Sequence, residues 1–119
     1  MLGATYERVA MNGPQKRFHV ALAVRDLDES IREYTARLGA EPCCVVEKTY
    51  ALWRTSEVNL SISVAPERAG TLRHLGFEDP SSPTMSMEAD PNGFEWERFS
   101  DAQQDDEIRA RYPNARFRP

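Results

Sequence analysis

A strand that runs straight into a helix, near the start of the chain, limits most strongly how this sequence can fold. In RFHVALAV (17–24) large apolar residues alternate with smaller ones, which predicts a strand with one face against a core. The next residues predict a helix at about 27–38, because Asp26 or Asp28 can cap its start, apolar residues recur at helical spacing, and Gly39 can end it. One strand and one helix cannot bury both faces of a sheet, so the rest of the chain must complete it.

The remaining residues supply the other strands. Six further strands are predicted, at 43–48, 50–55, 58–64, 71–79, 84–89 and 94–99. The segment 65–70 is a linker, and DPNG (90–93) is a turn. A last helix is predicted after Ser100, which can cap it, and before Pro113. The predicted fold class is therefore α+β.

Composition restricts the class of protein. With 119 residues the chain has room for one domain or two small intertwined modules. The net charge is -4 and the basic residues are scattered, which argues against nucleic acid or an anionic membrane as a partner. Residues 1–16 are predicted to be a flexible arm without the apolar segment of a signal peptide, and no apolar run is long enough to span a bilayer. Because the two cysteines, Cys43 and Cys44, are adjacent and so poorly placed for a disulfide, we expect a cytoplasmic location.

Two segments of the chain resemble each other. FHVALAV (18–24) and RHLGFED (73–79) each have a histidine near the start, followed by apolar and small residues. The two histidines, His19 and His74, lie 55 residues apart, a spacing that suggests a duplicated module.

Three blocks of sequence, in order, resemble the vicinal oxygen chelate superfamily, which includes glyoxalase I, bleomycin-resistance proteins and extradiol dioxygenases. The blocks are HVALAVRDLDESIREYTARLGAEP, RHLGFE and DPNGFEWERF, and the resemblance runs from about Phe18 to Phe99. The segments YALW, VNLSIS and NGFEWERF most resemble the cadmium-induced and organoarsenical-lyase branch. The resemblance implies a glyoxalase-like fold of paired βαβββ modules, at 17–65 and 71–99, followed by a helix and tail at 100–119.

The second module is expected to be shortened. Asn59 follows His19 after 40 residues, whereas Glu97 follows His74 after 23, which leaves too few residues for a second crossover helix and all of the strands. Without that helix an apolar face of the second half would lie uncovered. We therefore expect a homodimer, in which the terminal helix is a candidate for exchange. The pocket is expected to be shallow, open to water, or completed across the dimer.

The resemblance also implies a metal site. His19, His74 and Glu97 fall where the ligands of the family lie, and two imidazoles with one carboxylate suit a divalent ion such as Fe, Mn, Zn or Ni. Such a set leaves coordination positions open for a chelating substrate and for water or dioxygen. The implied function is a metal-dependent lyase or dioxygenase that acts on a small chelating substrate. No general base is identified.

One position departs from the family. Many members carry a glutamate as a fourth ligand where this chain has Asn59, which makes ordinary glyoxalase I chemistry less expected. Asn59 and Ser61 are candidate polar contacts of the substrate, and Tyr50 and Trp53 are candidate apolar ones. Arg54 is either a partner for an anionic substrate or a surface residue.

Two other functions stay open. A non-catalytic, drug-binding protein of the bleomycin-resistance type needs a pocket and no metal. A metal- or metalloid-binding protein would use the soft thiols of Cys43 and Cys44, although neighbouring side chains on a strand point to opposite faces. The complete set of three ligands favours the enzyme.

Overall fold

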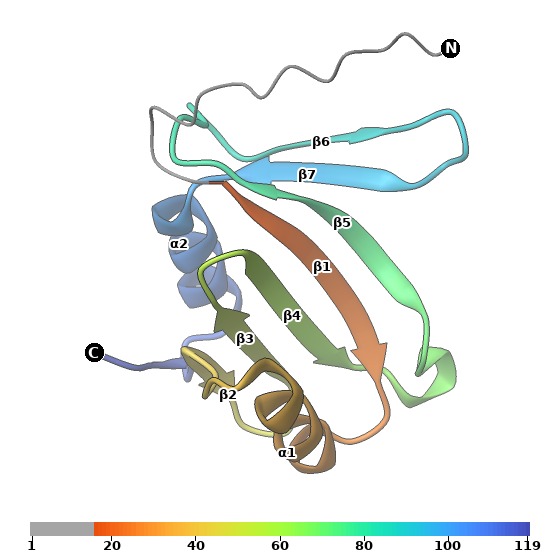
Figure 1. Cartoon of the computed structure of the whole chain (residues 1–119), viewed down its shortest axis with the longest axis vertical. Helices are drawn as coiled ribbons and strands as arrows, with labels where there is room; N and C mark the ends of the chain where they lie inside the picture. Colours follow the sequence, from red (N-terminus) through yellow and green to blue (C-terminus); the bar gives the residue numbers. More distant parts are fainter. Residues whose placement is uncertain (1–15) are drawn as a thin grey trace, which may run out of the picture.

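The computed structural model describes residues 16–119 and contains one eight-stranded sheet with two α-helices (Figure 1). The elements follow the chain in the order β1 (Arg17–Val24), α1 (Leu27–Leu38), β2 (Cys44–Val46), β3 (Tyr50–Arg54), β4 (Val58–Val64), β5 (Leu72–Glu78), β6 (Ser86–Ala89), β7 (Glu95–Phe99), α2 (Asp101–Arg111) and β8 (Arg116–Phe117). Across the sheet the strand order is β6-β7-β5-β1-β4-β3-β2-β8. The predicted α+β class is confirmed.

Each predicted strand and helix is present in the described part of the chain. The linker contains a 3-10 helix, Pro66–Arg68, and β2 ends earlier than predicted because the chain turns after Val46 and Lys48 has a positive φ of 61°. The two-residue strand β8 was not expected. Of the arm predicted at 1–16, only Lys16 lies among the described residues. No helix in residues 16–119 is long and apolar enough to cross a membrane.

The boundaries of α1 follow from its caps. The side chain of Asp26, rather than that of Asp28, accepts a hydrogen bond from the backbone N–H of Glu29 at 2.8 Å. At the other end Gly39 has the left-handed φ of 67°, and its N–H donates to the carbonyl of Thr35. The helix therefore begins and ends at the residues that the sequence indicates.

Two apolar clusters lie on opposite faces of the first half of the sheet. The cluster packed with α1 contains Val24, Leu27, Ala51, Trp53, Leu60 and Ile62. The cluster packed with α2 contains Cys44, Val46, Tyr50, Leu52 and Ile108. We call the two sides the α1 face and the α2 face. Because side chains alternate along a strand, β3 contributes to both.

Among residues 16–119, no helix covers the α1 face in the second half of the sheet. Phe18 and Phe77 are 40% and 41% exposed there, and their rings lie 5.8 Å apart. The ring of Trp96 stacks on Phe77 at 6.3 Å. The uncovered apolar face agrees with the expectation from the sequence, whereas the homodimer inferred from it stays a prediction.

The strand register brings four positions into one line across the middle of the sheet. β1 pairs in parallel with β4 and antiparallel with β5, so that His19 lies opposite both Asn59 and Gly76. β5 pairs in parallel with β7, and Gly76 lies opposite Glu97. A Cβ atom at position 76 would lie 1.9 Å from the backbone oxygen of Glu97, so only glycine lets β7 approach this closely. The four positions therefore share the α2 face.

Candidate metal centre

Three side chains from three strands converge on the α2 face. The Nε2 atoms of His19 (β1) and His74 (β5) are 3.0 Å apart. Oε1 of Glu97 (β7) lies 3.1 Å from Nε2 of His74 and 3.6 Å from Nε2 of His19. One ligand atom of each residue lies within 4.8 Å of the others, so the group can hold a metal ion. These are the three residues that the sequence suggested as ligands.

The convergence depends on the strand register and on the glycine at position 76. Ala21 of β1 lies opposite His74, which places the two histidines on neighbouring lines of the same face. Position 76 stands between His19 and Glu97 in the register, and its glycine lets the backbone of Glu97 come close to β5. The three ligand atoms can therefore face one another directly.

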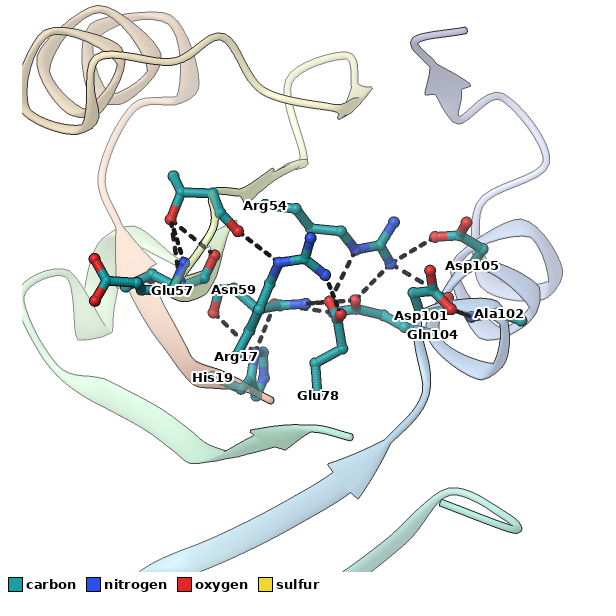
Figure 2. Close-up of polar contacts among 12 residues, drawn as sticks. Arg17, His19, Arg54, Glu57, Asn59, Glu78, Asp101, Ala102, Gln104 and Asp105 are labelled. Carbon is teal, nitrogen blue, oxygen red and sulfur yellow. Dashed lines mark hydrogen bonds and ion pairs between the residues drawn. The ribbon is translucent and has the colours of Figure 1, made fainter. Parts of the chain in front are cut away.

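Asn59 sets the orientation of His19 by contacting the ring nitrogen that faces away from His74 and Glu97. Nδ1 of His19 lies 2.8 Å from Oδ1 of Asn59 and 3.2 Å from its backbone oxygen. Nδ2 of Asn59 donates to Oε1 of Glu78 at 2.9 Å and to Oε1 of Gln104 at 2.8 Å, which fixes the direction of the amide (Figure 2). Oδ1 must then accept a hydrogen bond from Nδ1–H of His19. The lone pair of His19 is consequently on Nε2, the atom that faces His74 and Glu97, as in metal-bound histidines.

A buried ionic network holds Asn59 in turn. Glu78 is almost completely buried, and its carboxylate is paired with the guanidinium groups of Arg17 and Arg54, the latter at 3.2 Å (Figure 2). The guanidinium of Arg54 also donates to Oε1 of Gln104 at 2.7 Å and to Oδ1 of Asp105 at 2.8 Å, both on α2. A buried carboxylate of this kind is tolerated because it is paired and hydrogen-bonded. The network ties the C-terminal helix to the strand that carries His19.

The same surroundings favour the protonation states that bind metal. Burial is the largest influence on His19 and lowers its pKa, although its hydrogen bond to Asn59 acts in the opposite sense. Burial also raises the pKa of Glu97, but the hydrogen bond from His74 and nearby positive charge, including that of Arg73, outweigh it and hold that pKa below the usual value. A neutral imidazole and an ionised carboxylate are the forms that coordinate metals.

The three residues line a cavity of about 560 Å³, which α2 helps to enclose. Of the four candidate substrate contacts, Tyr50 and Ser61 line this cavity. Trp53 does not, because it points to the α1 face, where its indole N–H donates to Oγ1 of Thr35 at 3.4 Å. Asn59 does not either, since it lies fully buried behind the ring of His19.

The sequence did not identify the residues of the supporting network or the walls of the cavity. Arg54, considered as a substrate or surface residue, belongs to the buried network instead. The sequence did contain one signal for this network. Gln104 lies four residues before the apolar Ile108 and so shares one face of the helix with it, and both residues are buried in the structure. The cavity walls include Arg68, Leu72, Arg73, Met85, Met87, Glu95, Glu107, Ile108, Arg111 and Tyr112.

The two cysteines lie outside the candidate metal centre. Cys44 is buried among the apolar residues near α2, and burial raises the pKa of its thiol to about 11. Burial raises the pKa of the Cys43 thiol as well. Both groups are therefore thiols rather than thiolates at neutral pH, and the thiolate is the form that binds metals.

Comparisons with known proteins leave the family of this chain open. No family model matches the chain, and no curated protein matches it. Among solved structures it is similar to the crystal structure of NAD-dependent benzaldehyde dehydrogenase from Legionella pneumophila, with a TM-score of 0.48 and 14% identity over 70% of this chain and 97% of that chain. With a TM-score below 0.5, this likeness supports no conclusion about fold or function.

Proposed function

We propose that this protein is a metal-dependent enzyme of the vicinal oxygen chelate superfamily, a lyase or dioxygenase that acts on a small chelating substrate. The observation that supports the proposal most directly is the convergence of His19, His74 and Glu97 within 4.8 Å at a cavity. Two imidazoles and one carboxylate are a donor set that suits Fe, Mn, Zn or Ni.

The fit of a metal ion to these residues is supported by the hydrogen bonds around them. The Nε2 lone pair of His19 is directed at the group because Asn59 accepts the proton on Nδ1. Glu97 supplies the negative charge, which a divalent ion needs for binding in a partly buried site. When bound, such an ion would supply Lewis-acid activation of the substrate and open coordination positions.

The chain's own residues would bind and orient the substrate. Residues of α2, such as Gln104 and Ile108, and Met87 of β6 line the cavity with the three ligands, so a bound substrate would lie between these elements. Tyr50 and Ser61 form part of its wall. No acid or base is assigned to the reaction.

The sheet topology supports membership of the superfamily. In the first half, β1 pairs in parallel with β4, followed outward by β3 and β2. In the second half, β5 pairs in parallel with β7, followed outward by β6. The central strands β1 and β5 are antiparallel neighbours. On this support we infer two modules of one design, of which the second lacks the crossover helix and one strand.

Metal analysis tests the proposal. The protein is purified without chelators or affinity tags, and its Fe, Mn, Zn and Ni content is measured beside Glu97→Ala, His74→Ala and the control Glu95→Ala. Glu95 lines the same cavity two residues earlier on β7 but lies outside the ligand group. We expect about one ion per chain, lost in the first two variants and kept in the control. A metal-free protein that takes up none of the four ions would refute the proposal and favour a non-catalytic binding protein.

A further inference from the structure

An irregularity in β5 directs an arginine into the candidate active site. Ala21 of β1 lies opposite His74, but the next residue, Leu22, lies opposite Leu72, so Arg73 is an extra residue between two regular pairs. In a regular strand Arg73 would point away from the face of His74. Such a bulge changes the direction of a side chain, and bulges are frequent beside active sites. Arg73 accordingly lines the cavity together with His74.

The side chain of Arg73 extends across β1 on the α2 face. Its NH1 group donates a hydrogen bond to Oγ of Ser63 on β4 at 3.0 Å. Ser63 lies opposite Ala23, and the neighbouring position on the same face of β1 is Ala21. These two alanines are almost completely buried and leave the room that a larger residue would fill. The small residues of β1 therefore form the surface that the guanidinium passes over.

The hydrogen-bond partner of Arg73 is a hydroxyl group, whereas half of the arginines in residues 16–119 are paired with a carboxylate. Within residues 16–119, the ion pairs place a carboxylate within 4 Å of Arg17, Arg37, Arg54, Arg98, Arg111 and Arg118. No such pair is formed by Arg73 or by Arg68, which also lines the cavity. Among the described residues, the guanidinium groups of Arg68 and Arg73 thus line the cavity without a carboxylate partner.

The charges on the cavity wall favour a negative ligand once a divalent ion is present. The acidic wall residues are Glu95, Glu97 and Glu107, and Glu107 is paired with Arg111 at 3.8 Å. Glu97 would be neutralised by the ion that it binds. Positive charge then exceeds negative charge, and planar guanidinium groups bind carboxylates and phosphates through two parallel hydrogen bonds.

We propose that Arg73 is a specificity-determining residue, and that the substrate is a small acid with a chelating end on the metal and a second anionic group, a carboxylate or phosphate, on Arg73. This inference rests on the proposed function, because the chelating end needs the metal. Leu72 and Met87, on the wall of the same cavity, are the apolar residues that an apolar link between the two ends would contact.

Binding of three matched hydroxy acids tests the inference. Malate and 3-phosphoglycerate carry a 2-hydroxy acid at one end and a carboxylate or a phosphate at the other, and 2-hydroxybutyrate carries a methyl group in that place. Their affinities are measured by calorimetry for the metal-bound protein, for Arg73→Gln and for Arg37→Gln. Arg37 is the matched control, since it is an exposed arginine of α1 paired with Glu33.

We expect malate or 3-phosphoglycerate to bind about tenfold more tightly than 2-hydroxybutyrate, the gain of one charge-assisted hydrogen-bond pair. Arg73→Gln should abolish this preference and leave the metal content unchanged, and Arg37→Gln should keep it. Whether malate or 3-phosphoglycerate shows the preference identifies the anionic group. The inference is overturned if neither is preferred, or if the preference persists in Arg73→Gln.

The metal content of the same samples separates this inference from the proposed function. A protein that holds metal but shows no preference retains the proposed function and loses the role of Arg73. A protein that takes up no metal, yet still binds malate or 3-phosphoglycerate through Arg73, loses the proposed function and retains an anion site.

Discussion

Replacing Asn59 by leucine should separate metal affinity from fold stability. Leucine is similar in size but removes four hydrogen bonds: the one from Nδ1–H of His19 at 2.8 Å, the one to Glu78 at 2.9 Å, and the two exchanged with the amide of Gln104 at 2.8 and 3.3 Å. At about 1 kcal/mol for each buried hydrogen bond, the free energy of unfolding should fall by about 4 kcal/mol. His19 would keep only the longer contact with the backbone oxygen of residue 59, at 3.2 Å.

The metal should leave more easily because His19 is no longer held in one tautomer and orientation. Loss of a partner of this kind costs about 10–100-fold in metal affinity. The affinity is measured by competition of a chromophoric chelator for Zn²⁺, and stability by urea unfolding of the metal-free protein. Asn59→Asp, which keeps an acceptor for His19, should bind Zn²⁺ within about threefold of the unmodified protein even though a second carboxylate beside Glu78 lowers its stability.

Gln104→Leu is the matched control. It removes another buried amide of the same network, but Gln104 touches Asn59 and Arg54 and makes no hydrogen bond to His19. We expect a similar loss of stability with a change in Zn²⁺ affinity below about threefold. Equal losses of affinity in Asn59→Leu and Gln104→Leu would show that affinity simply follows stability, and the orienting role of Asn59 would be refuted.

Three further changes test other parts of the structure. Gly76→Ala should destabilise the fold by about 3 kcal/mol and abolish metal binding, because its Cβ would overlap the backbone oxygen of Glu97; a stable variant with normal Zn²⁺ affinity would contradict the close approach of β7. Hydrogen bonds from the backbone and hydroxyl of Ser81, and then from Arg98, lower the pKa of Asp79 from 3.8 to about 2. The stabilisation from this ionised carboxylate, about 2 kcal/mol, is therefore complete above about pH 5 and lost as the pH falls through 2, so Asp79→Asn should be less stable at pH 7 and should approach the unmodified protein toward about pH 1 by thermal unfolding. The homodimer predicted from the uncovered α1 face should dissociate on Phe77→Lys in sedimentation experiments, and a protein that sediments as a monomer at every concentration would show the prediction to be wrong.

The sequence predicted the elements well where local signals were strong. The alternation in β1 and the caps of α1 depend on neighbouring residues, and both predictions were confirmed. The helix α2 was predicted from Ser100, which forms a capping box with Gln103. β8 was missed because a two-residue strand is defined by its pairing with β2 and not by its own sequence.

Only part of the candidate site was predicted, because only part of it depends on local sequence. His19, His74 and Glu97 were chosen from three recognisable blocks, and the structure brings their ligand atoms together. The roles of Asn59 and Arg73 depend on strand register, which no local pattern specifies. Parallel pairing places Asn59 behind the ring of His19, and a one-residue slip in the pairing of β5 places Arg73 in the cavity.

The position of α2 has a consequence for access to the cavity. The three candidate ligands lie on β1, β5 and β7, whereas Gln104, Glu107 and Ile108 of α2 form part of the cavity wall. Hydrogen bonds from Arg54 to Gln104 and Asp105 hold α2 on the sheet. Local unfolding of this helix alone would therefore open the cavity to solvent and leave the three candidate ligands in place on their strands.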